Sequence, residues 1–248
     1  FEVFLLPDGA RPRFLSVMPA ADEIPDSSLA FMITDLLECF GAPGSAAFAT
    51  GAGLDYDALE SAAAEAAADG AVVLLIGTSA AFIHWLDRLA DDGRSFRLPE
   101  GSRLMDTGGF KGRGRRVEPD ELRAAYHERL GLDPACCVNE YGMTEMLSQL
   151  YDTGLLDRVR GLTRPPRKAG PPWVRSLAVD PETLAPLPPG EPGLLRHLDL
   201  ANAGSVPAVQ TEDYGAVDEH GLVLHGRAVG APPRGCSIAM DILLENAP

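Results

Sequence analysis

The sequence has no long hydrophobic run and very few lysines. Its longest continuous apolar segment, Ala71–Ile76, is far shorter than the roughly 20 residues that a membrane-spanning helix needs. Only Lys111 and Lys168 are lysines, so a mechanism that needs a lysine has two candidates. The formal net charge of −15 disfavours nucleic-acid backbones and anionic membrane surfaces as partners.

Cysteine and histidine are also scarce and widely spaced. The four cysteines form no C-x-x-C pair, and the five histidines form no H-x-x-x-H pair. We therefore expect neither a disulfide framework nor a structural zinc site, and a reducing cytoplasm suits the chain. The first residue is Phe1, and no signal-peptide pattern follows it. We expect the chain to be cut from a longer protein.

The first two thirds of the chain alternate strand and helix patterns. Apolar residues recur at helical spacing in two segments, and an alanine- and glutamate-rich segment has high helix propensity. A fourth helix is indicated by Pro119, which suits a first helical position, and by Gly131, which suits a helix end. The predicted helices are Ser28–Phe40, Asp57–Asp69, a segment from about Phe82 to Gly93, and Pro119–Leu130. The predicted strands between and before them are Arg13–Met18, Ala71–Ile76 and Cys136–Glu140. Such alternation is typical of an α/β fold with a mainly parallel sheet and flanking helices.

The pattern changes after about Gly161, where prolines and turn residues become frequent. Four short segments separated by turns suit strands: Trp173–Val179, Gly193–Leu198, Val209–Asp213 and Gly221–Arg227. We therefore divide the chain into an α/β core at 1–164 and a β-rich subdomain with a cysteine-containing tail at 165–248.

One polar motif follows a predicted strand, at residues Glu140–Met146. Carboxyl ends of strands in open α/β sheets are where ligands bind. Tyr141 offers a flat face for a base, Gly142 allows a close approach to the backbone, and Thr144 offers a hydroxyl. Glu145 offers the hard oxygen ligand that Mg²⁺ prefers. The same residues also suit a turn followed by a helix that Thr144 caps, and the motif alone leaves both interpretations open.

Tyr141-Gly142-Met143-Thr144-Glu145 resembles the hallmark of the adenylate-forming superfamily, which includes acyl-CoA ligases. Three further stretches resemble that superfamily's motifs in the same order: Gly190–Leu194, Thr211-Glu212-Asp213 and Gly226-Arg227. Glu212 stands where the superfamily pattern has glycine. The resemblance implies an adenylate-forming fold, incomplete at the N-terminus, that uses ATP and Mg²⁺.

Within the superfamily, the sequence most resembles the LuxE-type acyl-protein synthetases, which supply fatty acyl groups in bacterial bioluminescence. The resemblance covers nearly the whole chain. It rests on residues 27–32, 76–79, 106–113, 139–145, 148–152, 171–175, 199–202, 211–213 and 234–237. It implies activation of a fatty acid, or of another carboxylic acid, to an acyl adenylate. The acyl group would then pass to a cysteine as a thioester, for delivery to a partner reductase.

The resemblance also implies roles for single residues. Tyr141, with Gly142 beside it and the backbone at Gly108 and Gly109, would hold adenine. The nucleotide phosphate would bind Thr144, and Glu145 would hold Mg²⁺. The ribose hydroxyls would donate to Asp213, and Arg227 would contact ribose or phosphate.

The acyl acceptor that the resemblance implies is Cys236, twelve residues from the C-terminus. Arg234 would favour the thiolate form of Cys236, although a lone cysteine can also be an inert, half-buried residue. We expect Cys136 and Cys137 to be two small apolar residues of a strand rather than a reactive pair of thiols.

The role of two further groups is open at this stage. The basic loop that begins at Lys111 suits either an anion site or a solvated surface. We expect Trp85 in the core, with an acyl pocket as the alternative.

The sequence departs from the superfamily in two places. The Ser/Thr/Gly-rich phosphate loop would lie before Phe1, and Gly41–Gly53 does not clearly replace it. Only 21 residues follow Arg227, so the usual C-terminal lid with its lysine is absent from this sequence, a shortness that LuxE-type chains share. Two rivals therefore stay open: a phenylacetate-type CoA ligase, and a non-catalytic remnant that binds nucleotide or acyl groups.

Overall fold

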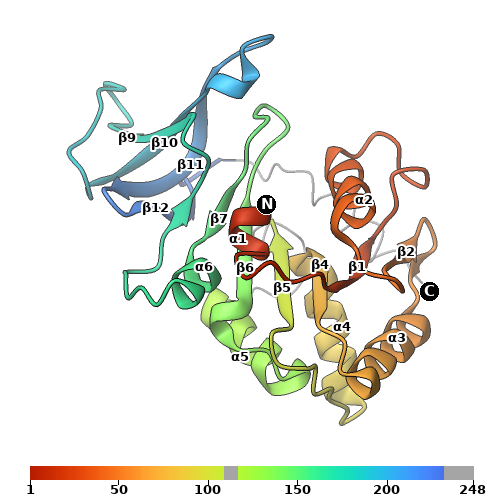
Figure 1. Ribbon diagram of the computed structural model, residues 1–248. Helices are drawn as coiled ribbons and strands as arrows, with labels where there is room; N and C mark the ends of the chain where they lie inside the picture. Colours follow the sequence, from red (N-terminus) through yellow and green to blue (C-terminus); the bar gives the residue numbers. More distant parts are fainter. Residues whose placement is uncertain (109–116, 232–248) are drawn as a thin grey trace.

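The computed structural model describes residues 1–108 and 117–231 (Figure 1). The helical elements are α1 (Glu2–Leu5), α2 (Ser28–Phe40), α3 (Tyr56–Asp69), α4 (Ser79–Asp91), α5 (Pro119–Leu130), η1 (Pro134–Cys136), α6 (Gly154–Val159) and η2 (Leu200–Asn202). The strands are β1 (Arg13–Pro19), β2 (Ala46–Thr50), β3 (Gly53–Leu54), β4 (Val73–Thr78), β5 (Arg103–Thr107), β6 (Cys137–Tyr141), β7 (Leu150–Asp152), β8 (Lys168–Ala169), β9 (Val174–Val179), β10 (Pro192–Asp199), β11 (Ala208–Asp218) and β12 (Gly221–Arg227).

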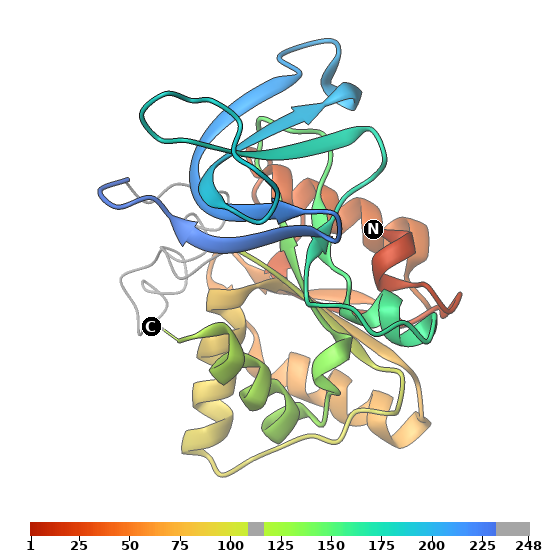
Figure 2. The same cartoon turned by 90° about the vertical axis from the view of Figure 1, so that its left-hand side faces the viewer.

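All these strands join one sheet in the order β3-β2-β1-β4-β5-β6-β7-β8-β12-β11-β10-β9. Strands β2, β1, β4, β5 and β6 are parallel, and the pairings from β6 to β9 are antiparallel. In Figure 2, α4 and α5 lie on one side of the parallel strands, and α1 and α6 lie on the other. The α/β fold with a mainly parallel first part and a β-rich second part is thus confirmed. The sheet continues across the boundary that we placed at residue 164, and that division stays a prediction.

The predicted helices form where local capping chemistry supports them. The Ser27 side chain accepts a hydrogen bond from the Ala30 amide at the start of α2, and Asp55 accepts one from Ala58 at the start of α3. α3 and α5 end at Gly70 and Gly131, each in the left-handed conformation. The predicted ends of α2, α3 and α5 agree with these caps to within one residue.

The core lies between the parallel strands and the helices that cover them. β4 is buried along its whole length, as its continuous apolar sequence predicts for a central strand. Trp85 is fully buried, and its Nε1 donates to Glu60 at 3.3 Å. The expectation that Trp85 packs in the core is confirmed. Among residues 1–108 and 117–231, no helix has the length and apolar character that a membrane crossing needs.

Arg103 on β5 ties the N-terminal segment to the sheet. Its side chain is almost fully buried and donates to the Leu5 carbonyl at 2.9 Å. Two further bonds, at 2.9 and 2.8 Å, reach the carboxylate of Asp8 and hold the pKa of Asp8 at about 2. The contact fixes α1 beside β5.

We expect Arg103→Leu to lower the free energy of unfolding by about 2 kcal/mol, because it leaves the buried Leu5 carbonyl without its donor. Urea denaturation measures this change. Arg97→Leu is the matched control, because Arg97 is exposed and makes one long bond, at 3.4 Å, to a carbonyl. Equal losses from the two substitutions would contradict a special role for Arg103.

Candidate active site

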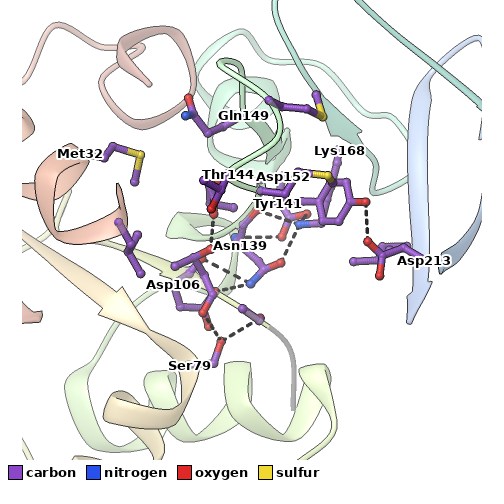
Figure 3. Close-up of a pocket in the computed structure, with 18 of the residues that line it drawn as sticks. Met32, Ser79, Asp106, Asn139, Tyr141, Thr144, Gln149, Asp152, Lys168 and Asp213 are labelled. Carbon is purple, nitrogen blue, oxygen red and sulfur yellow. Dashed lines mark hydrogen bonds and ion pairs between the residues drawn. The ribbon is translucent and has the colours of Figure 1, made fainter. Parts of the chain in front are cut away.

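A cavity of about 1840 Å³ opens at the carboxyl ends of β5 and β6. Strands β11 and β12 close it on one side, and α2 and α5 contribute to its other walls. Gly108, Tyr141, Gly142, Thr144, Glu145, Asp213 and Arg227 all line it. The structure therefore brings the described site residues that the sequence predicted to one cavity (Figure 3).

Gly109 and Cys236 lie outside the described residues, as does the basic loop from Lys111 to Arg116. The stretch Gly41–Gly53 contains β2 and the first residue of the edge strand β3, and it does not contribute to the walls of this cavity.

The floor of the cavity is a network of buried and half-buried polar groups centred on Lys168. The Lys168 ammonium donates to the Asn139 backbone oxygen and side-chain oxygen, each at 2.8 Å, and to Asp152 at 2.9 Å. Asn139 in turn donates to Asp106 at 2.8 Å, and Tyr126 donates to the same carboxylate at 2.9 Å. Lys168 thus uses all three of its hydrogens. It is a structural group of the floor, with no hydrogen left for a ligand.

Burial dominates the electrostatics of this floor. It raises the pKa of Asp106, although the hydrogen bonds from Asn139 and Tyr126 act in the opposite direction. Burial likewise raises the pKa of Glu140 to about 7, against a hydrogen bond from the Thr107 hydroxyl. Asp106 and Glu140 thus hold protons more tightly than ordinary carboxyl groups.

Tyr141 ends β6 with its ring buried and its hydroxyl turned toward β11. The hydroxyl donates to Asp213 at 2.8 Å (Figure 3). Arg227 donates to the other oxygen of Asp213 at 3.3 Å and to Glu212 at 2.6 Å. Burial and the Asp213 carboxylate both raise the pKa of Tyr141, so this phenol stays protonated.

A bulge in β11 turns Asp213 toward Tyr141. Leu194 pairs with Tyr214 and Arg196 pairs with Gln210, so residues 211–213 oppose Leu195 alone. The Thr211 hydroxyl stabilises the bulge by donating to the Leu195 carbonyl at 2.8 Å and accepting from the Asp213 amide at 3.1 Å.

The loop between β6 and β7 carries Thr144 and Glu145, both exposed to the cavity. Asp199 holds this loop by accepting from the amides of Leu147 and Ser148, at 3.0 and 2.8 Å. No helix follows Thr144 before α6, so the alternative of a helix that Thr144 caps is wrong. A β-carbon added to Gly142 would collide with the carboxyl group of Glu140, which is buried and hydrogen-bonded to Thr107. A larger residue at this position would therefore have to displace the Glu140 side chain.

Sequence reasoning missed several residues around the site. Asp106, Asp152, Lys168 and His197 come from four different strands, and their contacts span long sequence separations. Asp106, Ser148, Asp152 and Asp199 lie within the stretches that resemble the family, but the sequence assigned no role to any of them. The available signal was the predicted strand Gly193–Leu198, because side chains two residues apart in a strand lie on one face, which places His197 with Leu195.

The family model of the acyl-protein synthetase LuxE matches residues 49–243. The chain belongs to the LuxE family. One relative of this LuxE chain is a long-chain-fatty-acid–luciferin-component ligase of Aliivibrio fischeri. It is 45% identical over 53 residues, which are 21% of this chain and 14% of the relative. A ligase of the same name from Vibrio harveyi is 39% identical over 79 residues, 29% of this chain and 21% of the relative.

Solved adenylate-forming structures share the fold of this LuxE chain. ATP-bound MatB from Rhodopseudomonas palustris has a TM-score of 0.58 at 18% identity, covering 91% of this chain and 44% of MatB. A long-chain-fatty-acid-CoA ligase, FadD1 from Archaeoglobus fulgidus, has a TM-score of 0.57 at 15% identity, covering 99% and 48%. The chain thus spans less than half of these structures, and its matches cover under a quarter of the two curated relatives.

The raised pKa of Glu140 can be tested without any ligand, through the pH dependence of the protein's stability. Its native pKa of about 7 exceeds the ordinary value of 4.5, so the native state binds more protons than the unfolded chain between these pH values. Stability therefore falls as pH rises from about 4.5 to 7, and the cost is constant above pH 7. We expect Glu140→Gln to gain stability relative to wild type over that window, with no gain below it.

Urea unfolding at intervals from pH 4 to 8 measures this difference. Glu191→Gln, the same substitution at an exposed glutamate outside the cavity, is the matched control. A stability difference for Glu140→Gln that is flat across the range would show that Glu140 titrates normally.

Proposed function

We propose that this chain carries the adenylating core of an ATP-dependent acyl-protein synthetase. The core would join a fatty acid to AMP and pass the acyl group to Cys236 as a thioester, for delivery to a reductase partner in a reducing cytoplasm. The observation that carries the proposal is the convergence of Tyr141, Asp213, Arg227 and the Thr144-Glu145 turn on one cavity of a LuxE-family chain.

The β11–β12 side of the cavity suits the nucleotide. Asp213 is an acceptor for ribose hydroxyls, and Arg227 supplies positive charge beside it. Tyr141, together with Gly108 and Gly109, would hold adenine. The volume of about 1840 Å³ exceeds that of an ordinary small-molecule pocket, about 300–1,000 Å³, and accommodates two substrates.

Magnesium suits Glu145 only together with the nucleotide. The described residues contain no group of three or more His, Cys, Asp or Glu side chains that could hold a metal. Mg²⁺ commonly uses one or two carboxylates plus substrate phosphates, and Glu145 is an exposed carboxylate at the cavity. Glu145 would supply one oxygen ligand, and the ion would neutralise phosphate charge beside Thr144.

The α2 side of the cavity suits the acyl chain. Leu29, Phe31 and Met32 line it from this helix, and Met143 lines it from the motif loop. Figure 3 shows Met32 across the cavity from Asp213. An acyl chain along α2 would bring its carboxylate to the nucleotide phosphate near Thr144.

The chemistry would proceed in two displacements. The fatty carboxylate attacks the α-phosphorus of ATP, and pyrophosphate leaves with the bonding electrons. The Cys236 thiolate then attacks the acyl carbon, and AMP leaves. Arg227 and Mg²⁺ would stabilise the charge that develops on phosphate oxygens, which is the main requirement of such reactions.

A pyrophosphate exchange assay on the full-length protein tests the first displacement. Exchange that requires fatty acid is expected, with Asp213→Asn raising the KM for ATP at least about tenfold, because charged hydrogen bonds to ribose weaken. Asp218→Asn is the matched control on the same strand, because Asp218 pairs with Arg167. Absence of fatty-acid-dependent exchange in the full-length wild type would favour the non-catalytic remnant.

The buried cysteines make poor acyl acceptors. Burial raises the pKa of the Cys136 and Cys137 thiols, which lowers their thiolate fraction. This agrees with the prediction from the sequence that both cysteines are packing residues of a strand rather than a reactive pair. Cys39 on α2 is exposed and is therefore the natural control for any acylation experiment.

Labelling with radioactive fatty acid and ATP tests the acceptor. We expect Cys236→Ser to keep pyrophosphate exchange but lose the covalent label, because a serine hydroxyl is a far weaker nucleophile than a thiolate. Cys39→Ser should keep both. Undiminished labelling of Cys236→Ser would sink the assignment, and acyl-CoA formed only when CoA is added would favour a CoA ligase.

A further inference from the structure

Two buried polar side chains of strand β10, His197 and Asp199, contact Tyr141 and the loop that follows it. Leu195, His197 and Asp199 alternate along the inward face of β10 and are 0%, 0% and 1% exposed. Leu195 belongs to the apolar cluster that contains Tyr141, and Asp199 holds the loop after Tyr141. Burying a polar group is costly unless it is hydrogen-bonded, so the contacts of His197 need an explanation.

His197 lies in the middle of a chain of hydrogen bonds that ends at the cavity. Its Nδ1 is 2.9 Å from the hydroxyl of Ser176, its cross-strand neighbour on β9. Its Nε2 is 3.2 Å from the Tyr141 hydroxyl, which lies 2.8 Å from Asp213. These contacts link three antiparallel strands to the end of β6.

The donors in this chain have one consistent assignment. Tyr141 has a single hydroxyl hydrogen, and the short contact to the Asp213 carboxylate takes it. The Tyr141 oxygen therefore accepts from Nε2–H of His197, and Nδ1 accepts from Ser176. Desolvation lowers the pKa of His197 to about 4, so the ring is neutral near pH 7 and can adopt this tautomer.

We propose that His197 is a positioning residue of the nucleotide site, which fixes the Tyr141 hydroxyl so that it donates to Asp213 and holds that carboxylate in place. The proposal rests on the proposed nucleotide function of this cavity. His197 is fully buried and is not among the cavity-lining residues, so it acts through Tyr141. Fixing Tyr141 and Asp213 before binding would reduce the ordering that a nucleotide must otherwise impose.

Histidine NMR of the full chain tests the hydrogen-bond chain without any ligand. We expect a neutral ring with the proton on Nε2 from pH 5.5 to 8, and a changed Nε2–H signal in Tyr141→Phe. A protonated Nδ1 in the neutral ring, or a Tyr141→Phe spectrum identical to wild type at His197, would overturn the proposal.

Nucleotide binding tests the functional consequence. By calorimetry with ATP, His197→Leu should raise the Kd about three- to tenfold, the range expected for losing one hydrogen bond. In exchange assays, KM for ATP should rise while kcat changes less than about twofold. In a Tyr141→Phe background, His197→Leu should have no further effect, because the shared oxygen is already absent.

A second pair of variants covers the case in which His197→Leu does not fold. His197→Gln places an amide donor near the position of Nε2, so this variant should keep the Kd for ATP within about twofold of wild type. The His197→Asn variant, whose side chain is one carbon shorter than that of glutamine, should bind ATP as weakly as we expect for His197→Leu. The proposal would be overturned if His197→Gln and His197→Asn had equal Kd values for ATP. It would also be overturned if His197→Leu raised the Kd as much in the Tyr141→Phe background as in wild type.

Wild-type behaviour separates the two claims. If the full-length wild-type protein binds no ATP, the proposed function is overturned, and so is the role of His197 in a nucleotide site. A wild-type chain that binds ATP, beside a His197→Leu variant that folds and binds equally well, overturns the His197 proposal alone.

Discussion

The Lys168 ammonium joins the parallel and antiparallel parts of the sheet, and the geometry of the cavity depends on it. From β8 it reaches the backbone and side chain of Asn139 on β6 and the carboxylate of Asp152 on β7. These strands meet where the sheet changes from parallel to antiparallel. With all three hydrogens satisfied, the buried charge is compensated, and removing it would leave several acceptors unpaired. Asn139 immediately precedes the motif Glu140–Met146, so this contact fixes where the motif begins.

A second constraint determines where the motif leads. After Tyr141 the chain could turn in many ways, because the following eight residues form neither helix nor strand. The inward face of β10 selects one of them: His197 contacts the Tyr141 hydroxyl, and Asp199 accepts from the amides of Leu147 and Ser148. A polar network of this kind is specific because every member has a partner, and each unpaired member would be costly. The β-rich part of the chain therefore orders the loop that carries Thr144 and Glu145.

Local signals in the sequence were enough to predict helices α2 to α5 and several strands, whereas the short helices α1 and α6 were missed. The predicted bounds of α2, Ser28–Phe40, agree with the structure because a serine cap and a glycine frame a clear apolar period. Strand β5 was missed, since Arg103 and Asp106 interrupt its apolar pattern, and their burial depends on partners 95 residues earlier and 20 residues later. The same limit applies to the site. Tyr141 and Asp213 were found through motifs, whereas His197 and Lys168 act through contacts across strands that no local pattern encodes.

Glu212, which departs from the superfamily's Thr-Gly-Asp pattern, changes the electrostatics beside Asp213. Arg227 is 2.6 Å from Glu212 but 3.3 Å from Asp213, so the guanidinium group engages the exposed carboxylate more closely. Asp213 therefore has one oxygen firmly bound by Tyr141 and the other held by a long contact. Asp213 is thus paired with both Tyr141 and Arg227, while Arg227 is also paired with Glu212. In the proposed nucleotide site, a ribose hydroxyl would share the second Asp213 oxygen with Arg227, and the Glu212 carboxylate would keep Arg227 in place as that contact forms.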